Sequence, residues 1–257
     1  MEVNRQSLFP FLIFNREIKY NESITLYPIK MKDIILFQQY QSALTLRKDS
    51  IFCEKALIKM EYLDFLKYAC RNEELAQRYH MPLLSYYYDF IIGIFQLACS
   101  DETEIKYNSQ NLDLFINGFQ ITNAVFEDLR RILILQNDID FDVDEFINMD
   151  TVKALEKAKE FEAKKNKEKS DIEDYIDSFI IQMKVPEEYV SNLTIRKFWR
   201  YIKRINKHEE YQARRSGEMS GMVTFKEPLP HWMTSIEVTD KYENLKSDAD
   251  KLRSKIG

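Results

Sequence analysis

The sequence of 257 residues has few residues that interrupt helices and strands, with five glycines and six prolines. It also has few that form crosslinks or bind metals, with three cysteines and three histidines. Cys53, Cys70 and Cys99 are odd in number and widely spaced, which predicts reduced, buried thiols instead of a disulfide framework. No glycine-rich loop has a phosphate-binding pattern, and no two histidines have the spacing of metal ligands. We therefore expect neither an enzyme nor a bound cofactor or metal.

Long apolar runs are also missing, because no stretch approaches the roughly 18 to 20 residues that a membrane-spanning helix needs. The residues that are present are those of a globular protein, at 45% hydrophobic, 13% aromatic and 31% charged. The net charge of -5 disfavours nucleic acid as a partner, since proteins that bind it normally carry a basic domain. We expect a cytoplasmic protein that makes no contact with a membrane.

One acidic run, "NDIDFDVDEF", has the alternating aspartates of a calcium-binding loop. Such a loop needs glycine at its sixth position and a bidentate glutamate at its twelfth. Counting from Asp138, these positions hold Val143 and Met149, so the pattern fails. The run instead predicts an extended segment with its carboxylates in water.

The patterning predicts a mainly α (α+β) fold with two small β-hairpins. Alternating apolar residues over 18–29, with a polar turn at 21–23, predict the first hairpin, and Asn117-Gly118 predicts the turn of the second. Three-to-four-residue apolar spacing predicts helices over 34–44, 57–69 and 124–136, the last capped by Thr122 or Asn123, and a central buried helix from Pro82.

The domain prediction is an N-terminal unit over 1–148, a charged helical linker over 149–170 and a helical C-terminal unit over 171–257. Within the last, Ser170 or Asp171 caps a helix that stops at Pro186, and Asn192 or Thr194 caps a basic helix. We expect this basic helix to end at Gly217, because glycine suits the left-handed conformation beyond a helix C-terminus.

The basic helix, 195–215, and the loop "SGEMSGMVTFKEPLPHWM" that follows it form the candidate binding site. The helix predicts either a packed element with a solvated basic surface or a docking face for an acidic protein partner. Trp232 either pins the loop onto a core or, with Met233, lines a groove for a partner helix. The candidate partner-binding residues are Phe198, Trp199, Arg200, Lys203, Arg204, Met222, His231, Trp232 and Met233.

The order of three segments, "ITLYPIKMKDIILFQQY", "LDLFINGFQITNAVFEDLRRILILQNDIDFD" and "LTIRKFWRYIKRINKHEEYQARRSGEMSGMVTFKEPLPHWM", resembles the tail assembly chaperones of long-tailed bacteriophages that infect Gram-positive bacteria. The resemblance implies a non-enzymatic protein of the host cytoplasm. It implies binding to the tape-measure protein while tail-tube subunits polymerise around that protein. The tail-tube protein is a second expected partner, and whether the chain forms a homo-oligomer stays open.

Two other functions stay open at this point. One is a structural or connector component of a phage particle, which purified virions would retain. The other is a nucleic-acid-binding regulator that uses the basic helix 195–215, whose binding would depend steeply on salt.

Overall fold

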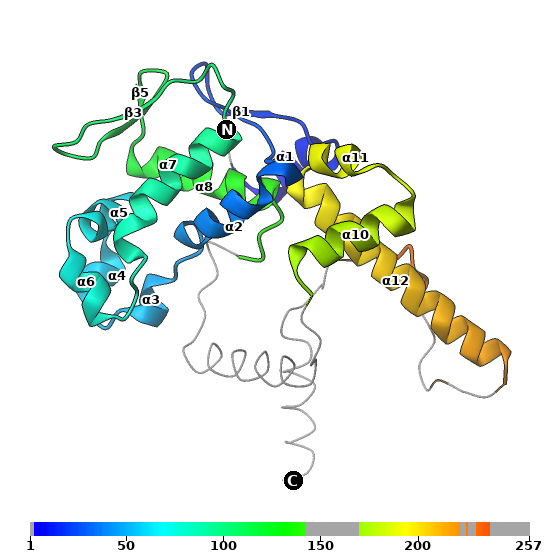
Figure 1. The fold of residues 1–257 in the computed structure, drawn as a ribbon. Helices are drawn as coiled ribbons and strands as arrows, with labels where there is room; N and C mark the ends of the chain where they lie inside the picture. The colour runs from blue at the N-terminus through cyan, green and yellow to red at the C-terminus, as the bar shows by residue number, and fades with distance from the viewer. Residues whose placement is uncertain (1–2, 142–169, 222–224, 226–229, 237–257) are drawn as a thin grey trace, which may run out of the picture. The chain divides into compact units, whose positions relative to one another are not determined.

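A computed structural model of the chain describes residues 3–141, 170–221, 225 and 230–236. Helices make up most of the described structure, and the strands form two small antiparallel sheets (Figure 1). The predicted fold class, mainly α with two small hairpins, is therefore confirmed. No described helix is both long enough and apolar enough to cross a membrane.

The first element is a helix that the sequence patterns did not predict, α1 (Arg5–Ile13). Asn4 starts it with a reciprocal capping box, in which its side chain accepts a hydrogen bond from the Ser7 backbone N–H at 2.8 Å. Pro10 lies inside the helix, although proline usually interrupts one. Leu8 is fully buried, and α1 packs against the later helix α8 (Asn123–Gln136).

The predicted first hairpin is confirmed as β1 (Ile18–Lys19) and β2 (Thr25–Leu26), with Ile18 opposite Leu26. Asn21 shapes its turn, because the side-chain oxygen accepts hydrogen bonds from the N–H groups of Ser23 and Ile24 at 2.9 and 2.8 Å. Ile18, Ile24 and Leu26 are buried, so one face of the hairpin belongs to the core.

Short helices fill the next stretch and lead to the central buried helix, α7 (Tyr87–Ala98). It begins at Tyr87 after a 3-10 turn, later than the predicted start at Pro82. Gly93 lets α7 approach α2 closely, because a Cβ there would lie 2.6 Å from the Tyr40 ring. The preceding elements are η1 (Met31–Asp33), α2 (Ile34–Tyr40), η2 (Gln41–Ala43), α3 (Lys48–Ile51), α4 (Lys55–Lys59), α5 (Tyr62–Cys70), α6 (Glu73–Arg78) and η3 (Leu84–Tyr86).

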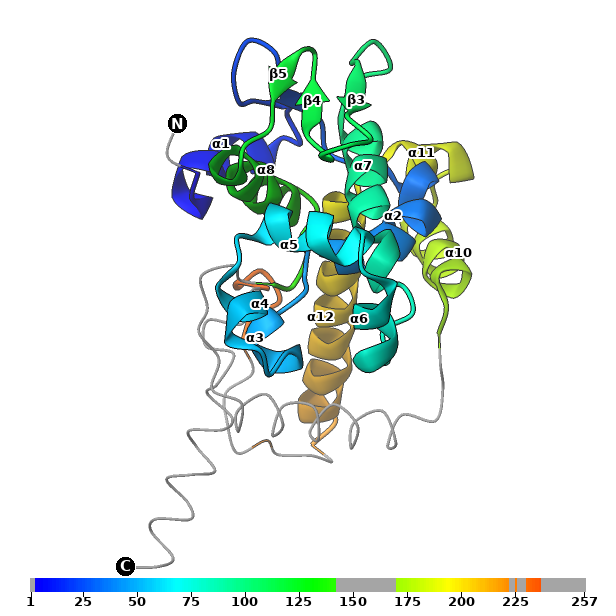
Figure 2. The same ribbon diagram turned by 90° about the vertical axis from the view of Figure 1, so that its left-hand side faces the viewer.

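The second hairpin is also confirmed, and a further strand extends it. β4 (Leu114–Ile116) and β5 (Phe119–Gln120) meet at Asn117 and Gly118, whose φ angles are 48° and 75°, and β3 (Ile105–Tyr107) pairs with β4 (Figure 2). Positive φ at both turn residues is what this sequence pair favours.

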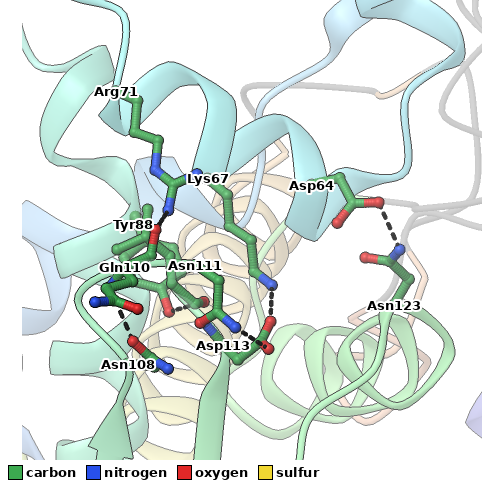
Figure 3. A network of polar contacts seen from close by, with 10 residues as sticks. Asp64, Lys67, Arg71, Tyr88, Asn108, Gln110, Asn111, Asp113 and Asn123 are labelled. Carbon is green, nitrogen blue, oxygen red and sulfur yellow. Dashed lines mark hydrogen bonds and ion pairs between the residues drawn. The ribbon is translucent and has the colours of Figure 1, made fainter.

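Polar contacts hold the loop between β3 and β4 against α5 (Figure 3). Lys67 on α5 pairs with Asp113 at 2.8 Å, and Arg71 donates to the carbonyl of Gln110. Underneath, the Tyr88 hydroxyl donates to the carbonyl of Leu112 at 2.6 Å, where the backbone has a positive φ of 59°. These contacts fix the loop from two sides.

The predicted helix after the second hairpin is α8, and Thr122 caps it by accepting a hydrogen bond from the Val125 N–H at 3.4 Å. Its inner face forms the aromatic core, because Phe126 is fully buried and its ring centroid lies 6.3 Å from that of Phe95 and 6.1 Å from that of Tyr62. Aromatic pairs at these distances add to the stabilisation from burial.

Three helices follow the residues that the structure leaves undescribed: α10 (Ile172–Met183), α11 (Glu187–Asn192) and α12 (Ile195–Met219). Two predicted caps are confirmed, since Asp171 caps α10 and the Thr194 hydroxyl accepts from the Lys197 N–H at 3.3 Å. The predicted helix end at Gly217 is wrong. Gly217 lies inside α12, and the left-handed glycine is Gly221, with a φ of 69°. Helical hydrogen bonding continues past Gly217, with the Ser220 N–H donating to Ser216.

By its contacts the chain divides into two units, Met1–Phe198 and Trp199–Gly257. In the first unit the backbone near the start of α12 pairs with the segment before α2, since Met31 N–H donates to Leu193 O at 2.8 Å and Ile195 N–H to Ile29 O at 2.9 Å. Nearly all of the predicted linker, 149–170, lies outside the described residues, so the predicted boundaries stay a prediction.

The cysteines are free thiols but differ in burial. Only Cys99 is buried, Cys70 is half-buried and Cys53 is exposed, so the prediction of three buried thiols is wrong for two of them. Burial raises the pKa of the Cys99 thiol to about 11.

Candidate partner-binding site

The candidate site begins at the start of α12, where the predicted residues have different surroundings. Phe198 is fully buried in the first unit, and its ring centroid lies 5.4 Å from that of Phe179 on α10. We therefore leave it out of the candidate surface. Trp199 and Arg200 are half-buried, and Lys203 is exposed.

Further along α12, two cations hold the loop that contains residues 230–236. The terminal nitrogen Nη1 of Arg204 donates to the carbonyls of Trp232 and Thr234, the second at 2.9 Å. The Nζ of Lys207 donates to the carbonyl of Ser235 at 2.7 Å and to that of Thr234 at 3.4 Å. We call Arg204 and Lys207 the clamp. Hydrogen bonds from charged donors are stronger than those between neutral groups. The clamp can therefore hold a loop that has no regular secondary structure of its own.

Aromatic rings add a second set of contacts between the helix and the loop. The His208 and Trp232 ring centroids lie 4.9 Å apart with the rings nearly perpendicular, and Tyr211 and His231 lie 5.2 Å apart in the same way. His231 and Trp232 are also neighbours at 5.8 Å. Edge-to-face geometry is favourable for such rings. Trp232 is thus half-buried between the clamp and two imidazoles.

A tight turn at His231 sets the direction of the next side chain. The Thr234 N–H and hydroxyl both donate to the His231 carbonyl, at 2.9 and 2.8 Å. The Met233 N–H donates to the Nδ1 of His231 at 3.2 Å. The turn leaves Met233 with 65% of its surface exposed, beside the anchored Trp232.

The clamp engages donors of Arg204 and Lys207 without neutralising the two charges, because backbone carbonyls carry no net charge. No described carboxylate forms an ion pair with either residue. Arg214 differs, since Glu210 pairs with it at 2.8 Å. Its guanidinium also lies 5.5 Å from the centroid of the Phe225 ring. The second unit therefore presents an exposed methionine next to two positive charges without acidic partners in the described structure.

Of the predicted site residues, Arg204, His231, Trp232 and Met233 are brought together. Met222 lies outside the described residues. The sequence reasoning missed Lys207, His208 and Tyr211, which contact the loop directly. They lie three, four and seven residues after Arg204, which is the spacing of one helix face. The spacing could have predicted that these residues share a helix face. It could not have predicted which distant segment the face contacts.

Residues 164–237 match the family model described as the YomV second domain. The match extends from the end of the predicted linker across α10, α11 and α12 to the loop, and leaves residues 1–163 and 238–257 outside. It indicates a phage-related protein. Searches of curated proteins and of solved structures found no match.

Proposed function

We propose that this chain is a phage tail assembly chaperone that binds the tape-measure protein in the host cytoplasm without chemical catalysis. The observation that carries the proposal is the pairing of an anchored Trp232 with an exposed Met233 beside the clamp, inside the segment that matches a phage family. Tryptophan and methionine are frequent in protein interfaces, the first as a rigid anchor and the second as an adaptable contact.

The chemistry of this surface suits an amphipathic helix with acidic residues at its edge. Met233 offers apolar contact to the helix stripe, while the uncompensated charges of Arg204 and Lys207 favour nearby carboxylates. A long tape-measure chain with exposed apolar stripes would aggregate unless such surfaces were covered. The tail-tube protein is a second proposed partner at the same stage of assembly.

The test is co-expression of this chain with the tape-measure protein of the same phage, followed by affinity purification. We expect the tape-measure protein to become soluble and to co-purify. Met233→Asp should reduce the co-purified amount at least tenfold without lowering the melting temperature, because the exposed side chain has little part in folding. Leu83→Asp is the matched control, since Leu83 is 51% exposed in the first unit.

Two results would contradict the proposal. One is the absence of a complex with the unsubstituted chain. The other is mass spectrometry of purified virions that finds the chain at fixed stoichiometry, which would favour a structural or connector component instead.

A further inference from the structure

A second exposed surface lies on the outer side of α10 and α11, in the first unit. Phe179 anchors the inner side of α10 through its buried contact with Phe198. On the outer side Ile181 is 76% exposed, and Met183 and Tyr189 are each 44% exposed. Three large apolar side chains are therefore accessible to a partner within nine residues of the sequence.

Carboxylates surround these apolar residues. Glu173, Asp177, Glu187 and Glu188 are all exposed, and none pairs with a described cation. Glu173, Asp177 and Ile181 follow at intervals of four, so they lie along one line of α10. Lys184 is the only basic residue between 171 and 193. We call this surface the acidic face.

The same chain carries a surface of opposite charge on α12. Arg200, Lys203, Lys207 and Arg214 follow one another at intervals of three, four and seven residues, so they lie along one stripe of the helix. Glu210 lies on the same stripe and pairs with Arg214 at 2.8 Å, which leaves a surplus of positive charge. Lys203 and Arg214 are exposed. The second unit also exposes apolar side chains, with Met219 at 79% and Met233 at 65%. We call this surface the basic face.

We propose that the chain associates with a second copy of itself, with the acidic face of one copy against the basic face of the next. Each face joins exposed apolar residues to a surplus of charge, negative on the acidic face and positive on the basic face. Both lie within residues 164–237, the range of the family match. Because the two faces differ, the contact is head to tail, and it closes into a ring or extends as a filament.

This proposal does not rest on the tape-measure proposal, although both use the basic face. Self-association would cover Lys203 and Met233 until a partner competes for them. The test therefore uses the purified chain alone, so that its failure and that of the co-purification experiment are separate results.

The measurement is the weight-average mass by light scattering across a concentration series. At about 20 mM salt the screening length is roughly 20 Å, and at about 1 M it is roughly 3 Å. We expect a mass above the monomer value of 30.8 kDa at low salt, rising with concentration, and a return toward that value at high salt.

Charge exchange makes the test specific. The double variants D177K/E188K and K203E/R214E should each stay monomeric, because each variant loses the excess charge on one face that attracts the other face. An equimolar mixture should associate, since the native acidic face of the second variant meets the native basic face of the first.

The matched controls make the same changes in net charge elsewhere on exposed residues. D101K/E102K and K55E/K59E should associate like the unsubstituted chain. Circular dichroism establishes that each variant is folded, and D177N/E188Q gives a milder second form of the acidic variant. A chain that stays at monomer mass in low salt at every concentration, or a mixture of the two variants that does not associate, overturns the proposal.

Discussion

In the first unit, Phe95 and Phe126 are buried and pack edge to face, whereas no side chain of residues 230–236 in the second unit is buried. The loop is held by charged donors to backbone carbonyls and by ring contacts. Apolar burial makes a cooperative core that opens only as a whole, while a few polar contacts allow local opening. The candidate site therefore lies on a segment that can open without unfolding the core of the first unit.

The strongest test of this contrast is Phe126→Ala in the core of the first unit. The substitution should lower the free energy of unfolding by about 3–5 kcal/mol, because it removes buried apolar surface and leaves a cavity between Tyr62 and Phe95. Chemical denaturation measures this. Ile35→Ala is the control, since Ile35 is 61% exposed, and it should cost less than about 1 kcal/mol. Equal losses would mean that the core is not where the stability lies.

The next largest effect concerns the buried cation Arg130. Its Nε donates to the Leu44 carbonyl at 2.7 Å, it pairs with Glu127 at 3.3 Å, and its guanidinium lies 3.6 Å from the centroid of the Tyr62 ring. Arg130→Met should cost about 1–3 kcal/mol, because the buried carbonyl loses its donor.

The control for this substitution is Arg78→Met. Arg78 pairs with Glu54 at 2.8 Å, but both side chains are exposed. Exposed pairs contribute about 0–1 kcal/mol, so this variant should be close to the unsubstituted chain. If Arg78→Met proved as costly as Arg130→Met, burial could not explain the difference between the two sites.

A third prediction uses the pKa of about 11 that burial gives the Cys99 thiol, above its ordinary value of 9.0. The folded state disfavours the thiolate. The protonated thiol therefore makes its full contribution to the free energy of unfolding below pH 9, and this contribution is lost as the pH rises toward 11. At about pH 10 the loss should be about 1.4 kcal/mol, since one pKa unit corresponds to that energy. Denaturation from pH 8 to 10 should show a shallower fall for Cys99→Ala. An unchanged slope would contradict the assignment.

The smallest effect on global stability is expected from Arg204→Met, which removes the donors that hold the loop. Unfolding of the core should change by less than about 0.5 kcal/mol, as for a surface substitution. The open form of the loop should instead increase by roughly tenfold, corresponding to about 1.4 kcal/mol. Emission of Trp232 measures this in a Trp199→Phe background, which leaves one tryptophan.

Arg215→Met is the matched control on the same helix, since Arg215 donates to the Tyr211 hydroxyl at 3.0 Å and not to the loop. It should leave the Trp232 emission unchanged. If Arg204→Met also left the emission unchanged while Trp232 remained shielded from a quencher, the clamp would not be what holds the loop.

The features predicted correctly from the sequence are those in which neighbouring residues decide the structure. Asn117 and Gly118 specify their turn through positive φ, and Thr122, Asp171 and Thr194 cap helices a few residues ahead. Prediction failed where local signals conflict. Pro10 lies inside α1, and Gly217 lies inside α12, because neither residue ends a helix whose other positions favour continuation.

The helical character of the chain, its two hairpins and the starts of α2, α8, α10 and α12 depend on interactions between residues a few positions apart, so sequence patterns predict them. The burial of Phe198 and the hydrogen bonds from Arg204 and Lys207 to the backbone of residues 232–235 depend on contacts between distant parts of the chain. Those contacts join residues up to 30 positions apart, and backbone carbonyls are the same for every residue type. A residue pattern therefore cannot predict which backbone carbonyl accepts a hydrogen bond from a distant cation.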